Sequence, residues 1–108
     1  MVSTRIEVLG TMYDVDFVGL KDQDIDGYCD YTSKRIVVRS DNKNEVENFE
    51  WLQKKQLRHE IVHAFLAECG LQSNFEHVNK WGHEETMVDW IAIMFPKLHE
   101  AFCAANAL

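Results

Sequence analysis

The spacing of apolar residues changes once along this chain, near Asp41, and the change constrains the fold more than any other feature. Before this point apolar and β-favouring residues alternate with polar ones, and after it they recur every three or four residues. We therefore expect an α+β domain, in which a small, mostly antiparallel sheet of three or four strands packs on helices. The alternation predicts strands over Arg5–Leu9, Met12–Val18, Gly27–Tyr31 and Arg35–Arg39.

The first helical segment is long, about 25 residues by its apolar spacing. Asp41 or Asn42 offers a side-chain oxygen to cap its start. Gly70 is a natural stop after Glu68 or Cys69. Its last third, 61–67, is apolar on nearly every side, which predicts that other elements enclose it.

A second helix is predicted from about Glu84 to Phe95, after the capping-box pattern Ser73-x-x-Glu76. Pro96 should end or kink this helix, because proline lacks the N–H that bonds four residues back. A short helix over Lys97–Ala105 then follows. The expected core face of the second helix comprises Val88, Ile91, Ala92 and Phe95.

Composition narrows the classes of function. We expect residues 1–108 to form a single domain, because 108 residues suffice for one core only. A net charge of −7 opposes attraction to nucleic-acid phosphates. The chain begins without a signal-peptide pattern and has no run of about 18 apolar residues. With three cysteines and no Cys-x-x-Cys, a reduced cytoplasmic protein without membrane or nucleic-acid ligands is expected.

The motif His59-Glu60-Ile61-Val62-His63 lies within the first predicted helix. Two histidines four residues apart point the same way and can bind one zinc ion at about 2.1 Å each. Glu60 can then reach a zinc-bound water and accept its proton as a general base. The alternative is a pair of satisfied polar residues on a core helix. Their burial would cost several kcal/mol unless they were paired or bound to metal.

A third ligand is needed, and its identity separates classes of zinc hydrolase. In the metzincin pattern a glycine follows the second histidine by three residues, and a third histidine follows three later. Leu66 and Cys69 occupy these positions here. Because the helix continues, Cys69 would lie about 9 Å along the axis from His63 and could not reach the same ion.

Glu85 is the predicted third ligand. It follows His63 by 22 residues, which leaves enough chain for a turn and a helix that crosses the first. Asp89 lies one helical turn later and can accept the N–H of a ligating histidine, which fixes its orientation. The alternative is that Glu84, Glu85 and Asp89 form a solvated acidic face.

These motifs resemble known zinc peptidases. His59-Glu60-x-x-His63 followed by Glu85-x-x-x-Asp89 resembles the gluzincin arrangement. More closely, roughly Gly27 to Phe95 resembles the ImmA/IrrE family of small metallopeptidases of bacteria and their phages or mobile elements. Where that family usually reads Glu-x-x-Ala-Asn-x-Phe-Ala, this chain has Glu85-Thr86-Met87-Val88-Asp89-Trp90-Ile91-Ala92. The resemblance implies a minimal zincin-like fold, one Zn²⁺ per chain, and a protein or peptide substrate such as a repressor.

Other parts of the site are expected by analogy with zinc peptidases, which align the substrate along an exposed sheet edge. We expect Arg35–Arg39 to be that edge. Tyr31, His77 and His83 are candidates for stabilising the oxyanion, each with the alternative of an ordinary surface or packing residue. His99 is expected to be solvated.

The remaining aromatic and sulfur side chains are expected to be structural. The predicted core aromatics are Trp51, Trp81, Trp90, Phe65 and Phe95, and the predicted buried or half-buried thiols are Cys29, Cys69 and Cys103.

Two functions from different classes follow. The first is a zinc-dependent peptidase. The second is a catalytically silent module of the same fold, encoded by a phage or mobile element, that binds a protein partner. Glu60 favours the peptidase, because a binding module has no use for a general base.

Overall fold

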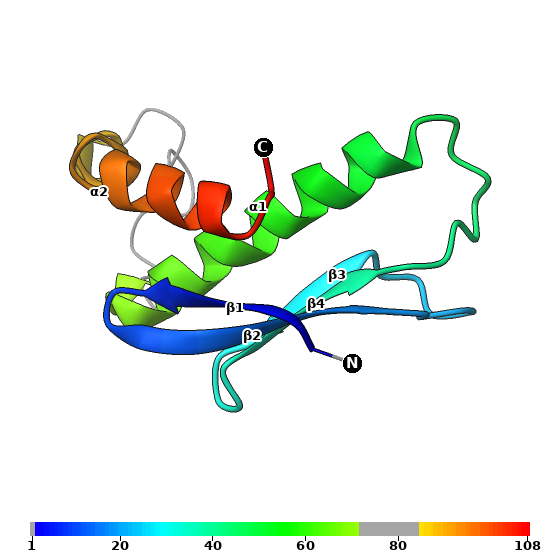
Figure 1. Cartoon of the computed structure of the whole chain (residues 1–108). Coiled ribbons are helices and arrows are strands. Elements are labelled where there is room, and N and C mark those ends of the chain that lie inside the picture. The colour runs from blue at the N-terminus through cyan, green and yellow to red at the C-terminus, as the bar shows by residue number, and fades with distance from the viewer. Residues whose placement is uncertain (1, 72–84) are drawn as a thin grey trace.

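The computed structural model describes residues 2–71 and 85–108, without the side chains of residues 2, 3, 85, 86, 88, 89 and 92. Four strands form one sheet, and both helices lie over the same face of it (Figure 1). The predicted α+β class is therefore confirmed. The elements are β1 (Val2–Val8), β2 (Thr11–Val18), β3 (Gly27–Asp30), β4 (Arg35–Arg39), α1 (Phe49–Glu68) and α2 (Glu85–Ala104).

The sheet is mixed, with the strand order β1-β2-β4-β3. The outer pairs β1–β2 and β3–β4 are antiparallel, whereas the central pair β2–β4 is parallel. The expectation that Arg35–Arg39 forms the sheet edge is therefore wrong, because β4 lies inside the sheet and β3 at its edge. Ile36, Val37 and Val38 are all buried, as suits a strand with a paired strand on each side.

Two tight turns connect the antiparallel pairs. Leu9 and Gly10 have φ angles of 50° and 91°, as in a type I′ hairpin, so this turn begins one residue earlier than predicted. After β3, the Asp30 carboxylate accepts hydrogen bonds from Thr32 and from the Ser33 backbone N–H. These bonds lower the pKa of Asp30 to about 2, so the turn is held by an ionised side chain.

Helix α1 begins later than predicted, at Phe49, where the Asn48 side chain accepts a hydrogen bond from the Trp51 N–H. Asp41 does not cap the helix. Its carboxylate instead binds the backbone N–H of Leu20 at 2.7 Å and the Arg39 guanidinium at 2.7 Å. The helix therefore has 20 residues. The predicted stop is confirmed, since the helix ends just before Gly70, which has a φ of 86°.

The core lies between the sheet and one face of α1. Phe65 and Ile61 are fully buried there, whereas His63 is exposed. The prediction that 61–67 is enclosed on nearly every side is therefore wrong, and one side of the helix is open. The residues of α1 in the core are Leu57, Ile61, Ala64 and Phe65, which join Ile6, Val8, Tyr13, Val15, Ile36 and Val38 from the sheet.

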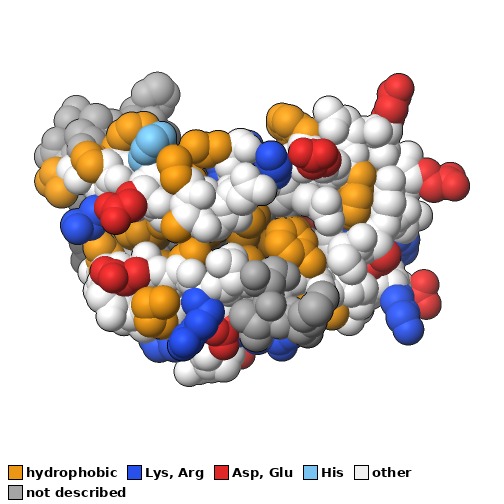
Figure 2. All heavy atoms as spheres, viewed as in Figure 1, with side chains coloured by type: hydrophobic (Ala, Val, Ile, Leu, Met, Phe, Trp, Pro, Cys, Tyr) orange, Lys and Arg blue, Asp and Glu red, His pale blue; other side chains and the backbone are white. Residues whose placement is uncertain are grey.

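Helix α2 continues through Pro96 to Ala104, so of the two predicted outcomes, an end or a kink, the end is wrong, and residues 97–104 do not form a separate helix. Pro96 itself is exposed. The predicted core face is also displaced, because Ile91 and Phe95 are 48% and 56% exposed. The buried side of α2 instead contains Trp90 and Leu98. These residues are about two helical turns apart and therefore lie on the same side of the helix. Figure 2 shows hydrophobic side chains on the surface over α2.

A polar cluster joins the end of α1 to the sheet. The Glu68 carboxylate accepts hydrogen bonds from Thr11 Oγ1 at 3.0 Å, from the Tyr13 hydroxyl at 2.7 Å and from Lys34 Nζ at 2.9 Å. The bond from Lys34 is the largest of the effects that lower the pKa of Glu68. Since Tyr13 is fully buried, its hydroxyl depends on this carboxylate as its acceptor.

We expect Glu68→Gln to lower the free energy of unfolding by about 1–3 kcal/mol at neutral pH, because hydrogen bonds to a charged acceptor are lost. The folded-state pKa of Glu68 is depressed, so its stabilisation is present above the ordinary value of 4.5 and is lost as pH falls through the folded value. Urea unfolding of both proteins at about pH 7 and about pH 3 measures this. Equal stability at neutral pH would contradict the assignment.

Candidate metal centre

One turn of α1 brings His59, Glu60 and His63 together. The two imidazole Nε2 atoms lie 3.1 Å apart, and the ring centroids are 4.7 Å apart. One ligand atom from each of the three residues lies within 4.8 Å of the others. Both histidines are exposed while Glu60 is buried. This group could hold a metal ion, and among the described residues it is the one such group of three.

Glu60 is held from within the helix. Glu60 is only 4% exposed. Gln56, one helical turn earlier, donates a hydrogen bond from its Nε2 to Glu60 Oε2 at 2.5 Å. A buried carboxylate without a donor would be strongly disfavoured. The Gln56 amide therefore accounts for the presence of a carboxylate on the buried side of the two histidines.

The three residues face an open groove of about 520 Å³ between α1 and β3. Within the described residues β3 pairs with β4 alone, so the backbone edge of β3 on the groove side is free of sheet partners. The residues that line the groove are Ile25, Asp26, Gly27, Tyr28 and Cys29 from β3 and the loop before it, and Gln56, His59, Glu60 and His63 from α1.

Alternation along β3 decides which side chains face the helix. Cys29 pairs with Ile36 and packs against the core, whereas Tyr28 pairs with Val37 on the opposite face of the sheet. Burial, with a smaller effect of the nearby Glu60 carboxylate, raises the pKa of the Cys29 thiol to about 11. Cys29 therefore contributes a neutral thiol to the groove at physiological pH.

A buried arginine positions the loop that forms one wall of the groove. The Arg39 guanidinium donates to the carbonyl oxygens of Lys21, Gln23 and Ile25. Asp41 balances its charge at 2.7 Å. The role of this loop at the site was not predicted from the sequence. The available signal was an arginine that directly follows the apolar run Ile36-Val37-Val38.

The structure brings together His59, Glu60 and His63 as predicted. It places Tyr31, which is exposed, in the turn after β3, outside the residues that line the groove. His77 and His83 lie outside the described residues.

The two acidic residues predicted to serve the metal lie at the start of α2. Glu85 is its first residue and Asp89 follows one turn later, and the side chains of both lie outside the description. The next residue, Trp90, is buried and donates its indole N–H to Cys69 Sγ at 3.2 Å. This contact joins the second turn of α2 to the end of α1.

The structural predictions for aromatic and sulfur side chains are partly correct. Burial of Phe65 and Trp90, partial burial of Cys29 and Cys69, and exposure of His99 are confirmed. Trp51, Phe95 and Cys103 are exposed, so their predicted burial is wrong. Trp81 lies outside the described residues.

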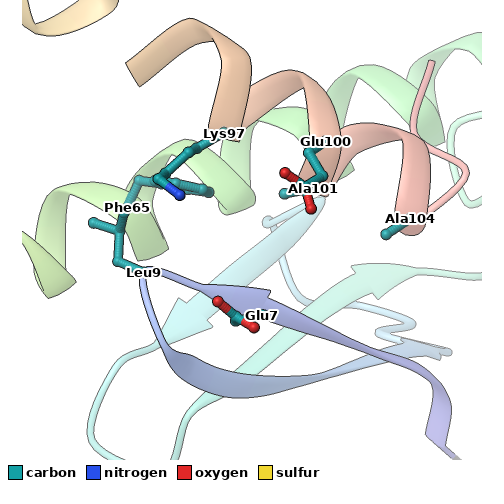
Figure 3. A pocket seen from close by; sticks show the side chains of 7 residues that line it. All are labelled: Glu7, Leu9, Phe65, Lys97, Glu100, Ala101 and Ala104. Atoms are coloured by element: carbon teal, nitrogen blue, oxygen red, sulfur yellow. The ribbon is translucent and has the colours of Figure 1, made fainter. Parts of the chain in front are cut away.

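A second cavity, of about 120 Å³, lies between β1 and α2. Figure 3 shows Glu7 of β1 on one side of it and Lys97 and Glu100 of α2 on the other. Its apolar lining includes Leu9 and Phe65, and it shares no residue with the groove. It is therefore separate from the candidate metal centre.

Neither α1 nor the described part of α2 combines the length and hydropathy that a membrane crossing requires. Comparison of the sequence with protein-family models, with curated proteins and with solved structures gave no match.

Proposed function

We propose that this protein is a zinc-dependent peptidase in which His59, His63 and Glu85 hold the metal. The observation that carries the proposal is the 3.1 Å separation of the two histidine Nε2 atoms beside Glu60. Two nitrogens bound to one tetrahedral zinc at about 2.1 Å would lie about 3.4 Å apart. The histidines therefore need only a small adjustment to share an ion.

Each residue of the group has a distinct part in hydrolysis. When bound, zinc supplies a water of lowered pKa and a positive charge for the carbonyl oxygen. Glu60 accepts the proton of the attacking water and delivers it to the leaving amine nitrogen. Its burial beside the groove keeps the carboxylate close to the two histidines.

Glu85 and Asp89 complete the proposed centre from α2. The Trp90 contact with Cys69 supports this, because it packs the turn that contains Asp89 against the helix of the histidines. Asp89 accepts the N–H of a ligating histidine in the proposal, which fixes the tautomer of that ring. Of the three candidates for stabilising the oxyanion, Tyr31 lies outside the groove lining, so His77 and His83 are the ones proposed.

The shape of the groove favours a polypeptide substrate. An extended peptide could pair with the free edge of β3 and pass the histidines, with its backbone bonded as an added strand. The resemblance to the ImmA/IrrE family supports a zincin-like fold and a regulatory protein, such as a repressor, as the substrate to test first. The same resemblance supports an association with a phage or mobile element.

Metal dependence tests this function. We expect the zinc-loaded protein to cleave members of a mixed library of unfolded peptides, with new amino termini identified by mass spectrometry. A chelator should abolish cleavage and added zinc should restore it. Glu85→Ala should require at least about tenfold more free zinc for half-restoration, because it removes one of three protein ligands.

The Glu100→Ala variant is the matched control, because Glu100 lies on the same helix at the separate cavity. It should follow the parent in the zinc titration. Cleavage that persists at full strength after complete removal of metal would contradict a zinc peptidase. Zinc binding without cleavage of any peptide or repressor would instead favour the interaction module.

A further inference from the structure

Gln56 is a residue of α1 whose side-chain amide is bonded to Glu60. Its Nε2 donates to Glu60 Oε2 at 2.5 Å, and both residues line the groove. Glutamine and glutamate one turn apart are a common surface pair that stabilises a helix by a few tenths of a kcal/mol. Glu60, however, is only 4% exposed, so this pair is not a surface pair.

The hydrogen bond from Gln56 is made to one oxygen of the Glu60 carboxylate, Oε2. Glu60 lines the groove together with His59 and His63. In the proposed reaction the oxygen that Gln56 does not bind, Oε1, takes the proton of the attacking water.

The backbone of β3 confines Gln56. A Cβ atom on Gly27 would lie 3.2 Å from Gln56 Cγ and 2.6 Å from the Val37 carbonyl oxygen. Glycine at this position thus lets the edge strand approach until it packs on the Gln56 side chain. Gln56 Cγ therefore lies close to the β3 backbone, while the amide of the same side chain is bonded to Glu60.

We infer that Gln56 is the positioning residue of Glu60, which fixes the carboxylate with one oxygen toward the groove beside His59 and His63. The inference rests on the proposed peptidase function. Gln56 touches neither the metal ligands' donor atoms nor the reacting atoms in this account, so its effect is exerted through Glu60.

Gln53 supplies a matched control one turn earlier on the same helix. Its Nε2 donates to the Arg39 carbonyl oxygen at 3.0 Å, so it anchors α1 to the sheet without contacting Glu60. Gln56→Met and Gln53→Met each remove one amide donor and keep the length of the side chain. They differ in which acceptor loses its partner.

The test has one readout that needs no activity. In the zinc-loaded protein, NMR couplings should show one Glu60 side-chain rotamer in the parent and in Gln53→Met, and averaging over several in Gln56→Met. A Glu60 side chain that stays equally fixed in Gln56→Met would overturn the inference, whatever the protein hydrolyses.

The second readout is hydrolysis of a library peptide that the parent cleaves. Gln56→Met should lower kcat about 10- to 100-fold, as expected for loss of a hydrogen bond to a charged group, with KM and zinc affinity unchanged. An unchanged kcat would overturn the inference. A parent that cleaves nothing would contradict the proposed function, while the NMR result would still decide whether Gln56 positions Glu60.

Discussion

Replacement of Glu60 by glutamine is expected to lower peptide hydrolysis by about 10²- to 10⁴-fold, which is the usual contribution of a general base. Glutamine has nearly the same shape as glutamate but cannot accept the proton of the attacking water. Its carbonyl oxygen can still accept the hydrogen bond from Gln56, so the helix should be undisturbed. The measurement is the rate of cleavage of a library peptide by zinc-loaded parent and variant.

Zinc affinity is the control for this variant. Since His59 and His63 remain, Glu60→Gln should bind zinc within a few-fold of the parent and unfold at a similar temperature. If both proteins cleave the peptide at the same rate, Glu60 is not the base. Loss of both zinc and hydrolysis would show that Glu60 is itself needed to hold the metal.

Removal of one histidine should have the largest effect on the metal itself. We expect His63→Ala to weaken zinc binding by more than about 100-fold, the upper range for changes to residues that only support a ligand. Under the proposal zinc binds the folded parent and not the unfolded chain, so an excess of about 1,000 times the Kd should stabilise the parent by about 4 kcal/mol. The measurement is the shift of the thermal unfolding midpoint with added zinc.

His99→Ala controls for a general effect of losing an imidazole. His99 is exposed on α2 and its ring stacks near Phe95, with a centroid separation of 5.8 Å. This variant should show the same zinc-dependent shift as the parent, whereas His63→Ala should show almost none. A shift of parental size in His63→Ala would place the zinc elsewhere.

The sequence allowed the elements to be predicted where local geometry decides the structure. Alternation marked all four strands because neighbouring side chains of a strand point to opposite faces. The strand order β1-β2-β4-β3 could not be predicted, since pairing of β2 with β4 joins segments that are distant along the chain. The start of α1 was misplaced for a similar reason, because Arg39 binds the carboxylate of Asp41 that was expected to cap the helix.

The candidate site also has one part that could be predicted from the sequence and one part that could not. His59, Glu60 and His63 were predicted together because a single helical turn fixes their relative positions. The groove depends on the edge position of β3, on the loop bound by Arg39 and on the close approach at Gly27, all of which are set by tertiary contacts. Gln56 was one helical turn from Glu60 in the sequence, and that spacing was the signal available.

The zinc X-ray absorption spectrum of the metal-loaded protein tests the central claim most directly. A centre held by His59, His63 and Glu85 predicts only nitrogen and oxygen scatterers at about 2.0–2.2 Å, with the outer-shell pattern of two imidazole rings. In His63→Ala the imidazole contribution should fall. A sulfur scatterer at about 2.3 Å, or the absence of imidazole from the spectrum of the parent, would contradict the account.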